Sequence, residues 1–266
     1  MCDSGDPEAL ASAVTASSLA ELSWSDRRGP RVRGVVALVR DGRPAVAFTY
    51  ADEAVARAVA AAGTAALSLT EGRSTGGGFQ TLLATGRPRL VEDLDGDVYA
   101  AELMLQELHR DPPSRLYVDS PLLQRENWWY LPRLVVELEV EQVRSLPARS
   151  SPEDHLLVVD GPDGLDVRTA RVVERRGERL SLEVDGPPAP GPAALFGQDA
   201  SFPDLERWAQ WTYRGAWDGS GLTVEEAPGV VGLPPTPGLL QRWRRHRHLE
   251  RRCTAALRRA RTDPGP

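Results

Sequence analysis

Short apolar runs bounded by turn-forming residues recur along most of this chain and restrict it to folds rich in antiparallel strands. The clearest case is Asp41-Gly42, which separates the apolar runs 32–39 and 45–50. An Asp-Gly pair between such runs is the strongest local signal of a β-hairpin, because glycine tolerates a positive φ. Similar turn signals follow at 161–164, 176–177 and 218–221. We therefore predict an α+β fold that is mainly β.

The other elements follow from hydrophobic periodicity and from residues that cap or end helices. Besides the hairpin, strands are predicted at 65–70, 134–141, 156–159, 166–173, 179–184, 193–196, 211–217 and 222–226. Residues 80–84 and 89–92 are predicted to form a further strand pair or one long bent strand. Helices are predicted at 7–22, 52–63, 97–110, 203–210 and 239–261. We expect the stretch 114–131 to be mostly irregular.

The segment 147–154, which reads PARSSPED, has the composition of a linker. It divides the chain into a first unit, residues 1–146, with an N-terminal helix, and a second β-rich unit, residues 155–266, which ends in a basic helix. The two units resemble each other weakly, as in GRPRLVED and GSGLTVEE. A tandem arrangement of two β-units therefore stays open as an alternative.

Composition excludes several kinds of chemistry. All 32 basic residues are arginine, so no lysine Schiff base, P-loop lysine or lysine general base exists here. Cys2 and Cys253 lie at opposite ends of the chain, and no histidine stands at metal-ligand spacing, so no metal site is expected. The N-terminus lacks an apolar signal region, and no apolar run approaches the roughly 20 residues that span a bilayer. We expect a cytoplasmic protein without a membrane partner.

The order of elements in 32–146 resembles the FMN-binding split barrel of the pyridoxamine 5′-phosphate oxidase-like superfamily. The resemblance rests on the hairpin VRGVVALVRDGRPAVAFTY, on ATGRPRLVED and on the terminal strand PRLVVELEVEQVRSLP. It implies an antiparallel split β-barrel with peripheral helices and an oxidoreductase that acts on a small-molecule substrate. It implies FMN as cofactor, with deazaflavin or haem as the alternatives found in some members. It also implies a homodimer, or a chain whose two halves imitate one.

The family grips the flavin phosphate with a segment of the form Ser/Arg-x-Lys-x-x-Asn. The corresponding stretch here, residues 51–58, reads ADEAVARA and has no lysine, no asparagine and two extra carboxylates. This departure keeps a second hypothesis open, in which a split-barrel relative without a flavin serves as a ligand-binding or regulatory protein. The joint absence of lysine and isoleucine is typical of a GC-rich genome and suggests an actinobacterial member of the superfamily.

Two groups of residues, each containing arginine, are candidates for binding an anionic part of the cofactor. Arg73, Ser74 and Thr75 precede three glycines, whose backbone N–H groups form an anion nest in such loops. The alternative is a flexible hairpin loop. Arg87 and Arg89 flank a proline on a predicted strand, and alternate strand residues share a face. They would clamp a phosphate or carboxylate together, or they are ordinary surface arginines.

The segment Asn127-Trp128-Trp129-Tyr130-Leu131-Pro132-Arg133 is a candidate for stacking on a planar ring. We predict that Trp128, Trp129 and Arg133 line the principal pocket and that Arg73 or Arg87 approaches it from another strand. At most one tryptophan can stack on the ligand, and the other should pack into the core or across an interface. The alternative is an aromatic plug or an interface.

The C-terminal helix is rich in arginine, a pattern found in segments that contact nucleic acid or anionic lipid. The whole chain is acidic, with a net charge of −6. We therefore favour docking of this helix on the acidic body of its own chain, and a nucleic-acid partner is disfavoured.

Overall fold

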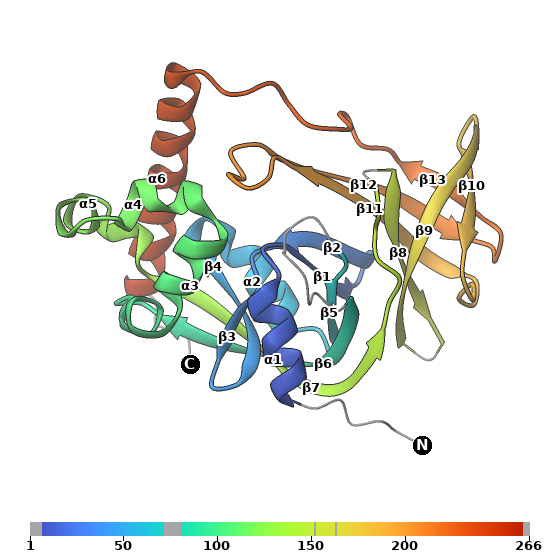
Figure 1. Cartoon of the computed structure of the whole chain (residues 1–266), viewed down its shortest axis with the longest axis horizontal. Helices are drawn as coiled ribbons and strands as arrows, with labels where there is room; N and C mark the ends of the chain where they lie inside the picture. Colours follow the sequence, from blue (N-terminus) through green and yellow to red (C-terminus); the bar gives the residue numbers. More distant parts are fainter. Residues whose placement is uncertain (1–6, 72–80, 152, 163, 263–266) are drawn as a thin grey trace.

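The computed structural model describes residues 7–71, 81–151, 153–162 and 164–262 of the chain (Figure 1). Its strands form a seven-stranded sheet in the first half and a closed barrel of six strands in the second. The ladders between neighbouring strands are antiparallel in both. The predicted fold class, α+β and mainly β with a barrel and peripheral helices, is confirmed.

The seven-stranded sheet has the strand order β2-β1-β5-β6-β7-β4-β3. Its strands are β1 (Ala20–Asp26), β2 (Gly29–Val35), β3 (Leu38–Arg40), β4 (Arg43–Thr49), β5 (Ala65–Leu69), β6 (Leu82–Asp93) and β7 (Arg133–Ser145). β6 and β7 are long, and their register shifts between Thr85 and Gly86. A Cβ at position 86 would lie 2.0 Å from the Glu139 carbonyl oxygen, so only glycine permits this close approach of the two strands.

Short helices cover the first half. They are α1 (Pro7–Ala16), η1 (Tyr50–Asp52), α2 (Glu53–Ala60), the π-turn η3 (Tyr99–Leu103), α3 (Met104–Arg110), η4 (Pro112–Ser114), α4 (Arg115–Val118), α5 (Pro121–Glu126) and η5 (Trp128–Tyr130). The predicted helices at 52–63 and 97–110 are found. The stretch 114–131, expected to be irregular, is instead mostly short helical turns that pack their apolar residues against the sheet.

The barrel has the strand order β10-β13-β12-β11-β8-β9 and closes through the pairing of β9 with β10. Its strands are β8 (Asp154–Gly161), β9 (Gly164–Arg176), β10 (Arg179–Val184), β11 (Gly191–Ala200), β12 (Trp208–Trp217) and β13 (Gly221–Glu226). β8 is apolar on both faces because Leu157 and Val159 fill the barrel interior while Leu156 and Val158 pack against the first half.

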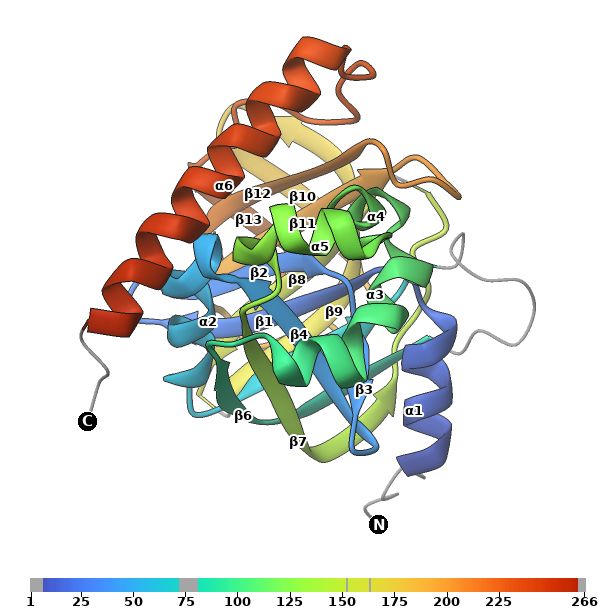
Figure 2. The same ribbon diagram turned by 90° about the vertical axis from the view of Figure 1, so that its left-hand side faces the viewer.

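The helix α6 (Leu239–Thr262) follows the barrel in sequence but packs on the first half. Residues 227–238 cross back from β13, and α6 then packs against η1 and η5 (Figures 1 and 2). Cys253, Ala256 and Leu257 are buried there, and the Arg252 guanidinium donates to the Ala51 carbonyl oxygen. The favoured docking of this helix on its own chain is therefore what the structure shows. None of the described helices combines the length and apolar character that a membrane crossing needs.

A buried polar network joins the two halves. The Glu21 carboxylate accepts hydrogen bonds from Arg149 Nη2 at 2.7 Å, from Gln198 Nε2 at 2.7 Å and from Thr70 Oγ1 at 3.0 Å. Glu21, Thr70 and Arg149 belong to the first half and the connecting segment, whereas Gln198 lies on β11 of the barrel. Because an unpaired charge in this dry interface would be costly, the network fixes one arrangement of the two halves.

Three sequence predictions about elements are wrong. The helix predicted at 7–22 ends at Ala16, and residues 20–26 form β1, whose first five residues are buried. The strand predicted at 32–39 breaks, so that only Leu38–Arg40 pairs with β4 across the Asp41-Gly42 turn. The helix predicted at 203–210 is a turn that leads into β12. In the first case the pairing of β1 with β2 and β5 overrides the local helical preference.

Candidate functional site

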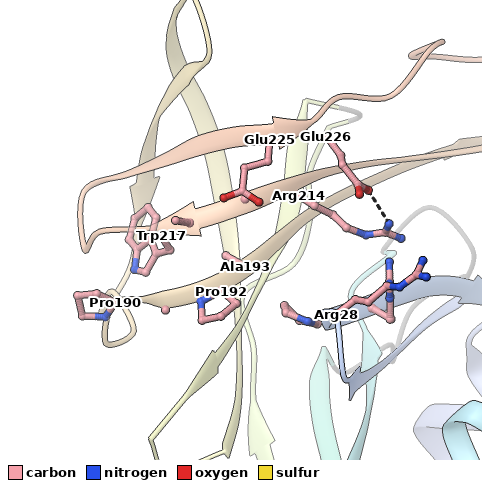
Figure 3. Close-up of a pocket in the computed structure, with 13 residues that line it drawn as sticks. Arg28, Pro190, Pro192, Ala193, Arg214, Trp217, Glu225 and Glu226 are labelled. Atoms are coloured by element: carbon pink, nitrogen blue, oxygen red, sulfur yellow. Dashed lines mark hydrogen bonds and ion pairs between the residues drawn. The ribbon is translucent and has the colours of Figure 1, made fainter.

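Two neighbouring cavities lie where β1, β2 and α2 of the first half face the barrel, and we call them together the interdomain groove. The larger, of about 720 Å³, we call the indole cavity; its lining includes Trp24, Arg33, Val55 and Trp208. The smaller, of about 560 Å³, we call the arginine cavity (Figure 3); its lining includes Arg28, Pro192, Trp217, Glu225 and Glu226. Arg31 and Arg214 line both cavities, so the two cavities adjoin at these side chains.

The groove exists because β2, an edge strand of the first sheet, is covered by the barrel rather than by another strand. The Gln210 side chain replaces a strand partner: its Oε1 accepts from the Gly34 N–H at 3.0 Å and its Nε2 donates to the Gly34 carbonyl oxygen at 3.1 Å. Gly34 permits this contact, since a Cβ there would lie 2.2 Å from Gln198 Oε1 and 2.8 Å from the Trp208 ring. Edge strands need such cover.

The indole cavity offers flat apolar surface. Trp24 comes from β1 and Trp208 from the start of β12, so each half contributes one indole. Trp208 Nε1 donates to Gln198 Oε1 at 3.0 Å, which fixes its ring. Trp24 Nε1 is buried without a hydrogen-bond partner among the described residues. Val55 and Ala58 of α2 complete one wall. Such surfaces suit a planar ring system.

The charged groups of the groove are only partly neutralised. Arg31 Nε pairs with Asp26 at 2.9 Å, and Arg214 Nη1 pairs with Glu226 at 2.9 Å. Partial burial acts to raise the pKa of Asp26, but hydrogen bonds from the Arg31 guanidinium and the Arg28 backbone N–H lower that pKa below its ordinary value. Arg214 Nε is buried without a partner, and within the described chain the Arg28 guanidinium has none either. The groove therefore holds guanidinium groups that are available to an anion.

Metal ligands are missing from the described lining. Neither cavity is lined by a histidine, cysteine, methionine or tyrosine, the side chains that usually bind haem iron. Within the residues placed by the structure, no three His, Cys, Asp or Glu side chains gather as a metal site requires.

The arginine candidates from the sequence lie elsewhere. Arg73, Ser74 and Thr75 fall outside the described residues. Arg87 and Arg89 lie on β6 and share a face, but each is paired with a glutamate of β7: Arg87 with Glu141 at 2.9 Å and Arg89 with Glu137 at 3.2 Å. Both arginine side chains are exposed on this sheet face, and neither lines the interdomain groove.

The aromatic segment lies under α6 and lines neither cavity of the groove. Trp128 is 44% exposed, with the Arg261 guanidinium 5.6 Å from its ring centroid. Trp129 is 2% exposed and packs edge-on against Tyr117 and His246. Trp129 therefore belongs to the core of the first half. The position agrees with the plug alternative more closely than with a pocket wall.

Arg133 is fully buried between the rings of Tyr99 and Tyr130. We call these three residues, together with Glu107, the buried arginine cluster. Its guanidinium lies 3.8 Å from the centroid of Tyr99 and 4.0 Å from that of Tyr130, and 3.5 Å from the Glu107 carboxylate. Tyr130 donates to that carboxylate at 2.7 Å. Burial opposes the charge of Arg133, yet the tyrosines and Glu107 raise its pKa above the ordinary value. The cation is thus held by the protein's own groups.

The segment that corresponds to the family's phosphate grip, residues 51–58, does not fit a phosphate. Asp52 pairs with Arg33 at 2.7 Å. Arg57, the basic residue of the segment, pairs with Glu53 at 3.0 Å and with Glu92 at 2.8 Å. A phosphate here would meet carboxylates and would have to displace them from the guanidinium groups. We derive no binding step through this segment.

Sequence reasoning missed the groove residues for a specific reason. Trp208, Gln210 and Arg214 alternate on one face of β12, but the predicted helix at 203–210 hid the first two of them. Arg31 and Arg33 alternate on β2 in the same way, and that spacing was a usable signal. Nothing local, however, indicates that β2 and β12 meet.

The sequence matches no protein-family model and no curated protein. Among solved structures, a protein of unknown function from Agrobacterium tumefaciens shares 16% identity at a TM-score of 0.38; the match covers 55% of this chain and only 58% of that protein. A haem-binding protein from Mycobacterium smegmatis matches at 13% identity and a TM-score of 0.35, over 94% of this chain and 99% of the other. The flavocytochrome Anf3 from Azotobacter vinelandii matches at 17% identity and a TM-score of 0.36, over 65% and 81%. TM-scores of this size carry no argument about function.

Proposed function

We propose that this protein is a ligand-binding split-barrel protein that holds a planar, anionic organic molecule of the flavin class in the interdomain groove. The observation that carries the proposal is the meeting of two indoles and several guanidinium groups, contributed by both halves, around one recess. Cavities of about 300–1,000 Å³ are typical of sites for small ligands, and both parts of the groove fall in this range.

The side-chain chemistry favours a flavin over haem. The partly exposed Trp208 offers a face for a ring, and indoles stack well on flat aromatic systems. Trp24 is 6% exposed and supports the floor of the cavity. Arg31 and Arg214 offer donors for an anionic group, which guanidinium binds in a bidentate manner. Haem, the other candidate that the family resemblance implies, would require an iron ligand that the described lining does not supply.

The finer proposal is an oxidoreductase in which bound FMN, or a related planar cofactor, supplies the redox chemistry. The residues of the groove bind and orient the cofactor and exclude water from one face of its ring. No side chain of the groove is assigned as a catalytic acid or base. The competing proposal is a binding protein without catalysis, and the two differ in whether a bound flavin turns over an electron donor.

A titration with matched tryptophan variants tests the binding site. Purified protein is first examined for visible absorbance and is then titrated with FMN, with flavin fluorescence as the readout. The Trp208→Phe variant should bind FMN about fivefold more weakly, since a stacked indole contributes on the order of 1 kcal/mol. Trp128→Phe is the control, because the Trp128 indole is exposed and lies away from the groove; this variant should bind FMN with the affinity of the parent. No FMN binding by the parent would overturn the proposal.

A further inference from the structure

Three guanidinium groups converge in the arginine cavity from both halves of the chain. Arg28 and Arg31 come from the β1–β2 turn and its flank, and Arg214 comes from β12 (Figure 3). Arg214 lies close enough to Asp26 to help lower the pKa of that carboxyl across the interface. Like charges repel one another, so a cluster of this kind requires an anion nearby.

The chain's own carboxylates satisfy this requirement only in part. Asp26 pairs with Arg31, and Glu226 pairs with Arg214 through a side chain that is 70% exposed. Exposed ion pairs contribute little, so a ligand anion would displace Glu226 readily. Glu225, the other carboxylate of this cavity, points away from Arg28 toward Trp217 in Figure 3. Arg214 Nε and the Arg28 guanidinium have no partner among the described residues.

We infer that the arginine cavity is a phosphoryl subsite, in which Arg28, Arg31 and Arg214 hold the phosphate end of the ligand whose ring occupies the indole cavity. The inference rests on the proposed function and narrows its ligand class to phosphorylated planar compounds, that is, mononucleotides of the FMN type. It also relocates the phosphate. The family resemblance places it on residues 51–58, where Arg33 and Arg57 are already paired with carboxylates.

The shared position of Arg31 and Arg214 supports this assignment. Both line the indole cavity as well as the arginine cavity, so they stand at the junction of ring site and phosphate site. Arginine forms two parallel hydrogen bonds to a phosphate, and the exposed Arg28 has its guanidinium open for this purpose. The β1–β2 turn and β12 are brought together only when the two halves dock, so the subsite is complete only in the folded whole chain.

The experiment compares FMN with riboflavin, which carries the same ring without the phosphate, in the full-length protein. The parent should bind FMN at least about tenfold more tightly than riboflavin, since hydrogen bonds between charged groups are stronger than those between neutral groups. Arg28→Gln should remove most of this preference and leave riboflavin affinity unchanged, because Arg28 lines the arginine cavity and is not among the residues that line the indole cavity. Arg214→Gln should also remove most of the preference. Arg87→Gln, in an exposed arginine on another sheet face, is the matched control and should keep the preference.

Misfolding could explain a loss of FMN affinity in the arginine variants, but it could not explain a gain, so a variant with higher affinity is the second test. Glu226→Gln releases Arg214 from its carboxylate and should raise FMN affinity about two- to fivefold, with no effect on riboflavin. Equal affinity of the parent for FMN and riboflavin overturns the phosphoryl subsite while the proposed function stands. Binding of neither flavin overturns the proposed function itself. A preference for FMN that survives in both Arg28→Gln and Arg214→Gln places the phosphate elsewhere and overturns the inference.

Discussion

Arginine and aromatic side chains lie together both in the buried arginine cluster and in the interdomain groove, and the two regions differ in what surrounds the cation. In the buried arginine cluster, Arg133 is 0% exposed and lies between the faces of Tyr99 and Tyr130, with Glu107 as its counter-ion. In the interdomain groove, Arg31 and Arg214 stand at the edge of two open cavities.

The difference separates structural arginines from binding arginines. Arg133 has protein on every side, so it contributes to the core and to the seat of α6. The groove arginines border empty volume, and their carboxylate partners are partly exposed, so a ligand anion can replace those partners. Both regions combine arginine with aromatic side chains, so residue type does not distinguish the two roles. A cavity next to the guanidinium group does distinguish them.

The largest loss of stability is expected from a substitution in the buried arginine cluster. Replacing Arg133 by Met removes the cation but leaves Glu107 buried without its charge partner, and breaking a buried pair typically costs about 3–5 kcal/mol. Chemical denaturation should show this loss of stability. At a temperature where the variant stays folded, its FMN affinity should equal that of the parent. Loss of binding without loss of stability would reverse the roles assigned to the two clusters.

A substitution at the interface should affect the groove and stability together. The Cβ of Gly34→Ala would lie 2.2 Å from Gln198 Oε1 and 2.8 Å from the Trp208 ring, so these side chains must move. Overpacking of this kind costs about 1–3 kcal/mol. Thermal unfolding should occur at a lower temperature, and FMN binding should weaken because the Trp208 ring is displaced. Gly42→Ala would be a poor control because Gly42 has a positive φ; Gly63→Ala, where a Cβ meets nothing within 4 Å, is the suitable one.

The stability of the folded protein should also depend on pH, through the carboxyl group of Asp111. Burial raises the pKa of Asp111 from 3.8 to about 7, and the nearby Glu107 adds to the rise. The folded state then binds this proton more tightly than the unfolded state, so the contribution of Asp111 to stability falls as the pH rises from about 4 to about 7. Asp111→Asn should stabilise the protein above pH 7 by on the order of 2 kcal/mol and have little effect near pH 4. An equal effect at both pH values would contradict the assignment.

The smallest effect on stability is expected from the groove itself. Glu226→Gln breaks an ion pair whose carboxylate is 70% exposed, so the free energy of unfolding should change by less than about 0.5 kcal/mol. The same variant should still change FMN affinity. A large loss of stability would mean that the groove arginines are structural, like Arg133.

The parts of the fold that depend on local signals could be predicted from the sequence. The Asp41-Gly42 turn is one, since both residues adopt a positive φ, of 48° and 73°, as the tight hairpin turn requires. The docking of α6 is another, because its buried residues recur at helical spacing. The groove depends instead on the meeting of β2 with the barrel, and no local pattern around Gly34 or Gln210 indicates that contact. The aromatic composition of residues 127–133 led us to expect a ligand pocket there. Packing of these rings in the core around Arg133 accounts for the same composition.

Hydrogen–deuterium exchange of the full-length protein, with and without saturating FMN, tests the location of the site most directly. The account predicts slower exchange in β2 and in β12 when FMN is present, because the ligand bridges the two halves of the groove. Exchange in the segment 128–133 should not change. Protection of 128–133 without any change in β2 and β12 would contradict the account and would place the ligand at the aromatic segment under α6.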